Sequence, residues 1–379
     1  MTPLSSYFLL LVIMVFNSFS SQAQERPREL GIKIGVLPSG EQNSITDVSG
    51  VSVGQLTKIQ GDQIRTGVTA ILPHQSNLFQ NKVPAAVYVG NGFGKLAGST
   101  QIEELGNIES PIILTNTLSV AAGIEGIVKY TLAESGNESV QSVNAVVGET
   151  NDGYLNDIRG MHVSAEDVKQ AILSAKSEIV EEGNVGAGTG TVCFGFKGGI
   201  GTSSRKLPDN LGGFTVGVLV QTNFGGVLQF NGVPLGEELN QYTFRNQLES
   251  ADGSCMIIVA TDAPVNERNL KRMAERAMLG LARTGGIASN GSGDYVIAFS
   301  NYQGNLIPHQ SKPYEKQAVH MLANDDMTSL FLATIEATEE AIINSLWAAT
   351  DMKGKDGRLI KALPKDKTME ILRKYNRLP

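Results

Sequence analysis

The sequence predicts an α/β protein in which helices cover two packed β-sheets. Several short runs rich in β-branched and aromatic residues are apolar on both faces, which is typical of strands in sheets covered on both sides. Three longer segments carry apolar residues at helical spacing. The 379 residues suffice for one large domain or two ordinary ones, and no repeat or low-complexity linker divides them. We therefore expect helices layered over sheets.

Five runs carry the strand prediction, and each is short enough for a buried strand. They span residues 85–89, 143–147, 214–222, 256–260 and 295–299.

The three predicted helices span residues 164–182, 266–284 and 326–350. The first begins with Ser164 and Asp167 in the spacing of a capping box. The second ends at a pair of glycines, and all three place apolar side chains on one face.

Composition excludes several classes of function. The formal charge is −7, and no basic and aromatic residues interleave as nucleic-acid binding requires. The basic stretch at residues 353–377 is interpreted as a solvated helix surface.

Cys193 and Cys255 lie in apolar runs, so we expect two buried thiols rather than a disulfide. Four scattered histidines and two cysteines form no metal-ligand pattern, so neither a metal nor another cofactor is expected.

The N-terminus has the pattern of an export signal. The apolar run at residues 7–16 is too short to span a bilayer, and Ser21 and Ala23 place small residues where signal peptidase needs them. We expect residues 1–23 to be removed and the mature protein, residues 24–379, to be periplasmic or secreted without a stable membrane span. A membrane-tethered N-terminus is the alternative interpretation.

A candidate nucleophile lies deep in the chain. Gly253 and Ser254 open an apolar strand-like run, SCMIIVAT, and no His-centred motif supplies a base. A serine that becomes a new N-terminus can use its own α-amine, which titrates near pH 8, as that base. Gly253 gives the preceding peptide bond freedom to adopt strained angles that favour attack. Local sequence alone makes this a weak signal, because Gly-Ser before a strand is also a common turn.

The chain around this run resembles the L-aminopeptidase/D-amidase-esterase family, which includes the β-peptidyl aminopeptidases. GSCMIIVATDAPV is similar to the family's processing segment, and further similar blocks follow in family order over nearly all of the mature chain. These blocks are TDVSGVSVG (46–54), GVTAILP (67–73), VPAAVYVGNGFGKLAG (83–98), ELGNIESPIILTNTLSV (104–120), VNAVVGETNDGYLNDI (143–158), VGAGTG (185–190), FKGGIGTSSR (196–205), VGVLVQTNFG (216–225) and NGSGDYVIAFS (290–300).

The resemblance assigns roles to individual residues. It implies autocleavage between Gly253 and Ser254, with Ser254 as nucleophile. Ser292 and Asp294 match a serine and an acidic residue that orient the new amine, and some members have the longer Glu in place of Asp294. Asn223 matches the donor to the oxyanion.

Three further positions lie in the block ETNDGYLND. Tyr154 matches an aromatic position near the nucleophile. Glu149 or Asp152 supplies a carboxylate for the ammonium group of the substrate, and the sequence leaves open which of them does so.

The resemblance also implies the architecture and the activity. We expect a four-layer αββα sandwich like that of N-terminal-nucleophile hydrolases with a different chain path. We expect self-cleavage into residues 24–253 and 254–379, and hydrolysis of L-, D- or β-aminoacyl amides, esters or small peptides. The processed pairs are expected to form a homo-oligomer.

Two alternatives stay open. An acyltransferase of the ornithine acetyltransferase class shares the architecture, but it uses Thr where this chain has Ser254. An inactive periplasmic binding module would have no reason to retain Ser254, Asn223, Ser292 and Asp294 together.

Overall fold

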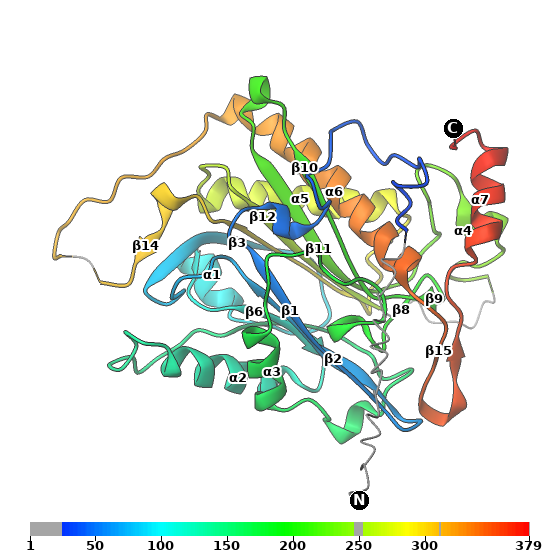
Figure 1. The fold of residues 1–379 in the computed structure, drawn as a ribbon, viewed down its shortest axis with the longest axis horizontal. Coiled ribbons are helices and arrows are strands. Elements are labelled where there is room, and N and C mark those ends of the chain that lie inside the picture. The colour runs from blue at the N-terminus through cyan, green and yellow to red at the C-terminus, as the bar shows by residue number, and fades with distance from the viewer. Residues whose placement is uncertain (1–24, 246–252, 311, 379) are drawn as a thin grey trace, which may run out of the picture.

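The computed structural model describes residues 25–245, 253–310 and 312–378. The export signal expected at residues 1–23 therefore lies outside the described residues. Four layers make up the fold, with a helix pair on the outer face of each of two stacked sheets (Figure 1). The predicted αββα sandwich is confirmed.

The first sheet has five strands and is mixed, since β6 and β7 run parallel while the other pairs are antiparallel. Its order is β1 (Ser52–Gln60), β2 (Ile64–Leu72), β6 (Ile112–Asn116), β7 (Val146–Thr150) and β4 (Leu96–Ala97). Helices α2 (Val120–Ala133) and α3 (Ala165–Leu173) cover its outer face.

The second sheet has seven strands, and β12 and β13 form its parallel pair. Its order is β10 (Ile200–Lys206), β11 (Thr215–Asn223), β12 (Ser254–Thr261), β13 (Gly293–Ser300), β3 (Asn81–Gly92) and β14 (Ile307–Pro308), with β5 (Asn107–Ile108) also paired to β3. Helices α5 (Glu267–Arg283) and α6 (Met327–Ala348) cover this sheet.

Smaller helices and strands, besides several short 3₁₀ helices, lie around these layers. They are α1 (Ser99–Leu105), α4 (Leu235–Glu238), α7 (Lys365–Lys374), the hairpin of β8 (Val192–Cys193) with β9 (Phe196–Lys197), and the hairpin of β15 (Met352–Lys353) with β16 (Leu359–Ile360). Within the described ranges, no helix is long and apolar enough to cross a bilayer.

Three apolar clusters fill the three interfaces between the layers. Alternate residues of each central strand point to opposite faces, so β12 sends Cys255, Ile257 and Val259 towards α5 and α6, and Met256 and Ile258 towards the first sheet. All eight residues of β12 are buried, which explains why this run is apolar on both faces. Both cysteines are buried as predicted.

Four of the five predicted strands and two of the three predicted helices are found close to their expected positions. The run at 143–147 is shifted, because β7 begins only at Val146. The backbone N–H of Asn144 donates to Glu109 Oε1 at 2.8 Å instead of to a neighbouring strand.

The helix predicted over residues 164–182 is too long. The capping box of Ser164 and Asp167 is present, but α3 ends at Leu173. Beyond it, Lys176 exchanges both backbone hydrogen bonds with Val53 of β1, and the Ser177 hydroxyl donates to Val51 O. Pairing with the sheet edge therefore replaces the last turns of the helix.

A buried ion cluster ties α6 to β10. Arg205 is fully buried, and its guanidinium donates to Glu336 at 3.1 Å and to Glu340 at 2.7 Å. Arg28 of the N-terminal segment also pairs with Glu340, so the cluster joins three distant parts of the chain.

Replacing Arg205 with Met should lower the free energy of unfolding by roughly 3–5 kcal/mol, because buried Glu336 loses its ion pair and Glu340 retains only the one with Arg28. Urea titration measures this change. Lys129→Met removes an exposed ion pair with Glu125 on α2. It should change the free energy of unfolding by less than about 0.5 kcal/mol. Equal effects of the two substitutions would contradict the assignment of stability to this cluster.

Candidate active site

Ser254 is the first residue of β12, and its neighbours are set by strand pairing on both sides. In the sheet it lies opposite Asn223 of β11 and opposite Gly293 of β13. Directly opposed residues of antiparallel strands have side chains on the same face, a few ångströms apart. The register therefore places the Asn223 amide beside the Ser254 hydroxyl.

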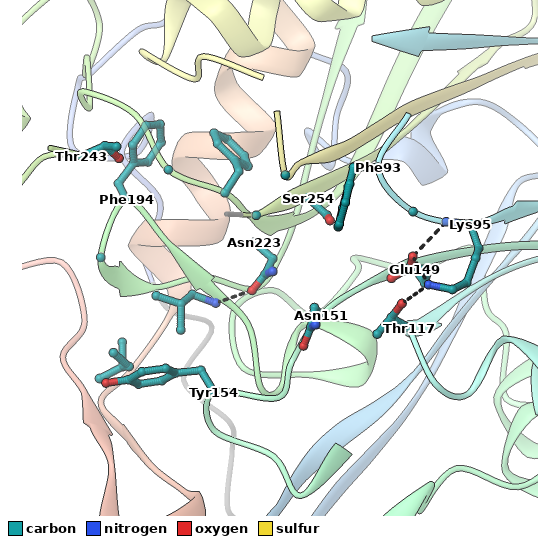
Figure 2. Close-up of a pocket in the computed structure, with 18 of the residues that line it drawn as sticks. Phe93, Lys95, Thr117, Glu149, Asn151, Tyr154, Phe194, Asn223, Thr243 and Ser254 are labelled. Atoms are coloured by element: carbon teal, nitrogen blue, oxygen red, sulfur yellow. Dashed lines mark hydrogen bonds and ion pairs between the residues drawn. The ribbon is translucent and has the colours of Figure 1, made fainter. Parts of the chain in front are cut away.

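The Asn223 amide is held in one orientation. Its Oδ1 accepts the backbone N–H of Val192 at 2.9 Å, and because a backbone N–H can only donate, the amide oxygen must face it. The NH₂ group is then turned towards the side of the pocket where Ser254 lies (Figure 2). This is the arrangement that a donor to a developing oxyanion requires.

The backbone N–H of Gly293 serves two acceptors at the same point. It lies 3.2 Å from the carbonyl oxygen of Gly253 and 3.2 Å from Ser254 Oγ. A side chain at Gly293 would collide with the main chain, because a Cβ there would lie 2.6 Å from the carbonyl oxygen of Phe93. Glycine is thus required for the main chain at Phe93, which follows β3, to pass close to the start of β13.

Ser292 and Asp294 flank that glycine and are buried rather than part of the pocket wall. The Ser292 hydroxyl donates to Asp294 Oδ1 at 2.9 Å, whereas Oδ2 is buried without a hydrogen-bond partner of good geometry among the described residues. Burial raises the pKa of the Asp294 carboxyl to about 6, although the Ser292 hydroxyl and the Cys255 backbone favour the charged form.

A pocket of about 1010 Å³ opens in front of Ser254, between the ends of the two sheets. Aromatic side chains line part of it: Phe194, Phe224 and Tyr242 contribute, and Phe93 lies beside Ser254 (Figure 2). Another part is polar and includes Thr117, Glu149 and Asn151 (Figure 2). Such a mixture suits a small substrate with a polar end.

Glu149 is the last but one residue of the buried strand β7, and it turns its carboxylate into this pocket. Its Oε1 accepts the backbone N–H of Lys95 at 2.9 Å and lies 3.5 Å from the Lys95 ammonium. Within the described part of the chain, Oε2 accepts no hydrogen bond, and it is not counted among the fully buried unpaired atoms. Glu149 therefore offers one free acceptor to a ligand.

Asp152 does not reach the pocket. It is 2% exposed and accepts from the Asn156 side chain at 3.0 Å, behind the wall. Burial raises the pKa of its carboxyl to about 7, against the hydrogen bonds from Thr66 and Asn156 and the charge of buried Lys197. Of the two carboxylates that the sequence left open, only Glu149 can touch a ligand in the pocket.

Tyr154 lies on the pocket rim, half exposed. The guanidinium of Arg358 stacks on its ring at 5.1 Å and donates to its carbonyl oxygen at 3.2 Å. Tyr154 thus lines the same pocket as Ser254, but in Figure 2 it lies farther from Ser254 than Asn223 does.

Several lining residues had no recognisable signal in the sequence. Lys95 and Thr117 belong to separate loops, and in the folded chain Lys95 contacts both Glu149 and Thr117. The Val192 N–H that orients Asn223 is a backbone group, which no side-chain pattern reveals. No group of three or more His, Cys, Asp or Glu residues in the described ranges could hold a metal ion.

The fold is a variant of the N-terminal-nucleophile hydrolase fold, and a serine at a strand start beside an amide donor is suited to acyl transfer. The chain belongs to peptidase family S58, whose match covers residues 43–360. It is a serine aminopeptidase that hydrolyses N-terminal amide or ester bonds.

Relatives and solved structures agree with this assignment. The β-peptidyl aminopeptidase BapA of Sphingosinicella microcystinivorans is 40% identical, and the alignment covers 96% of each chain. A β-aminopeptidase from a Burkholderia species superposes with a TM-score of 0.84 at 41% identity, over 92% of this chain and 98% of that one. The L-aminopeptidase D-Ala-esterase/amidase of Ochrobactrum anthropi, a prototype of the serine aminopeptidases, gives a TM-score of 0.85 at 37% identity, over 94% and 100%.

Proposed function

We propose that this aminopeptidase cleaves its own chain between Gly253 and Ser254 and then uses Ser254 to remove N-terminal β-aminoacyl groups from amides and small peptides. One observation carries the proposal. Strand pairing places Ser254 at the pocket floor, between the Asn223 amide and the Gly293 N–H.

The turnover follows from these positions. The free amine of Ser254 takes the hydroxyl proton, and Oγ attacks the carbonyl carbon of the substrate. The Asn223 NH₂ group stabilises the oxyanion, the C–N bond breaks, and the amine returns the proton to the leaving group. Water then hydrolyses the ester on Ser254 and releases the acid.

The surroundings of the Gly253–Ser254 bond support self-cleavage. The Gly253 carbonyl accepts from Gly293 N–H, which polarises it towards attack by the Ser254 hydroxyl. The buried Asp294 Oδ2 lacks a good donor in the continuous chain. The ammonium of a new N-terminus at Ser254 would provide a charge-assisted donor close to it.

The pocket supports specificity for a free amino end. Glu149 is the only acidic residue among the described residues that line it, and its Oε2 is free to accept an ammonium. The β-aminoacyl class is supported by two of the relatives, because one is named as a β-peptidyl aminopeptidase and the other as a β-aminopeptidase.

Export and assembly complete the proposal. The signal pattern of residues 1–23 supports a periplasmic or secreted protein. Exposed apolar side chains on the loop before α6, including Tyr314, Val319 and Met321, support a homo-oligomer of processed pairs.

The purified enzyme should consist of two chains. N-terminal sequencing should read Gln24 for the larger chain and Ser-Cys-Met-Ile from Ser254 for the smaller one. Ser254→Ala should remain one folded, inactive chain, because it removes the attacking oxygen, whereas Ser254→Cys should still cleave. An active enzyme of one intact chain, or a start at Cys255, would refute self-cleavage at this bond.

Asp294→Asn should move the acid limb of the pH profile of kcat/KM to lower pH. A nearby carboxylate stabilises the protonated amine and so raises its pKa, and removing that charge lowers the pKa of the base. Steady-state assays from pH 5 to 9 measure the shift, with Asp262→Asn at the far end of β12 as control. An unchanged limb, or a shift to higher pH, would show that Asp294 does not face the amine.

Glu149→Gln should lower kcat/KM for free β-aminoacyl p-nitroanilides about 10- to 100-fold, since a charged hydrogen bond contributes roughly 1.5–3 kcal/mol. N-acetylation of the substrate should cause a similar loss in the wild type and little further loss in the variant. Asp152→Asn, behind the wall, should retain the preference for the free amine. Similar rates on free and acetylated substrates in the wild type would rule out an aminopeptidase pocket.

A further inference from the structure

The polar end of the pocket holds one cation as well as one anion. Among the described residues that line the pocket, Glu149 is the only acid and Lys95 the only base. Glu149 is 3% exposed, but the Lys95 side chain is 54% exposed and follows the pocket wall (Figure 2). A ligand can therefore touch the ammonium of Lys95 directly.

The Lys95 ammonium is held in place without being saturated. It donates to Thr117 Oγ1 at 2.7 Å and makes a longer contact of 3.5 Å with Glu149 Oε1. An ammonium has three N–H donors, so one remains for a ligand. Thr117 and the Lys95 backbone together fix the position of this charge beside Glu149.

The charge balance of the site points to an additional group on the substrate. Glu149 and Lys95 cancel each other in the free pocket. A substrate ammonium on Glu149 leaves two cations facing one carboxylate, at a place partly shielded from water, where like charges repel more strongly. A carboxylate on the substrate beside its ammonium would restore neutrality by pairing with Lys95.

We propose that the preferred acyl group is β-aspartyl, a β-aminoacyl group whose amine-bearing carbon also carries a carboxylate. Glu149 binds its ammonium, Lys95 binds its α-carboxylate, and its side-chain carbonyl lies at Ser254. The two charged substituents share one carbon, which matches two protein charges that are themselves in contact. The proposal rests on the function proposed above, in which Glu149 holds the ammonium and Ser254 attacks.

The reaction is an ordinary hydrolysis that needs no further reactant. Ser254 Oγ forms an ester with the side-chain carbonyl carbon of the β-aspartyl residue, and the amide C–N bond breaks as the leaving amine takes the proton. Water then adds its oxygen to the same carbon, and its proton restores the Ser254 hydroxyl. The products are aspartate and the shortened peptide or amine.

Three p-nitroanilides test the proposal on the wild-type processed enzyme. They are β-aspartyl with a free α-carboxylate, the same compound with a neutral α-carboxamide, and β-homoalanyl, in which a methyl group replaces the carboxylate. We expect kcat/KM for the carboxylate to exceed that for the carboxamide by about tenfold or more. Equal values, or a preference for the carboxamide, would overturn the proposal without any variant.

Lys95 is then tested as the source of this preference. Lys95→Met should lower the carboxylate-to-carboxamide ratio by about tenfold or more, and Lys95→Arg should largely retain it because the positive charge remains. Lys129→Met, another lysine paired with a glutamate but exposed on α2, should leave the ratio unchanged. If the ratio persists in Lys95→Met, the substrate carboxylate does not pair with Lys95. The role of Lys95 would then be only to balance the charge of Glu149.

The β-homoalanyl compound separates the two proposals. If the wild type cleaves it but shows no preference for the α-carboxylate, the aminopeptidase function stands and the β-aspartyl specificity falls. If no β-aminoacyl compound is cleaved by a processed enzyme, both fall. Should Lys95→Met fail to fold, the wild-type substrate comparison and Lys95→Arg still decide the question.

Discussion

The pairing of β12 with β11 on one side and β13 on the other is the interaction on which the active site depends. It places Ser254 opposite Asn223 and Gly293, so an amide donor, a backbone donor and the nucleophile meet without any long side chain having to find its position. A slip of one residue would turn Ser254 to the helix side of the sheet and Cys255 into the pocket. The complete burial of β12 makes such a slip costly.

The packing of the two sheets sets the second distance that matters, between the nucleophile and the charged end of the pocket. Ser254 belongs to the second sheet, whereas Glu149 lies near the end of β7 in the first. The apolar cluster between the sheets includes Met256, two residues after Ser254, and Val146, three residues before Glu149. The length of acyl group that can join the two points is thus determined by a well-packed interface rather than by a flexible loop.

In the uncleaved chain, a buried carboxylate oxygen near the proposed cleavage point lacks a hydrogen-bond partner of good geometry among the described residues. A buried carboxylate oxygen without a good donor, as at Asp294 Oδ2, is destabilising. In the processed enzyme proposed here, the Ser254 amine would supply a charged donor for that oxygen. Cleavage would then also create the catalytic base, which is the α-amine of Ser254. The Asp294 carboxylate would gain this charged partner only in the processed enzyme.

The sequence by itself determined the central strands, α5, α6 and the position of Ser254 at the start of an apolar strand, because these depend on local periodicity and on short motifs. Family resemblance then supplied the roles proposed for Asn223, Ser292 and Asp294. Only the tertiary structure decided that α3 stops at Leu173, that Glu149 rather than Asp152 faces the pocket, and that Lys95 lies beside it. Each of these is set by contacts between segments far apart in the chain, where one residue's direction depends on which sheet edge or loop packs against it.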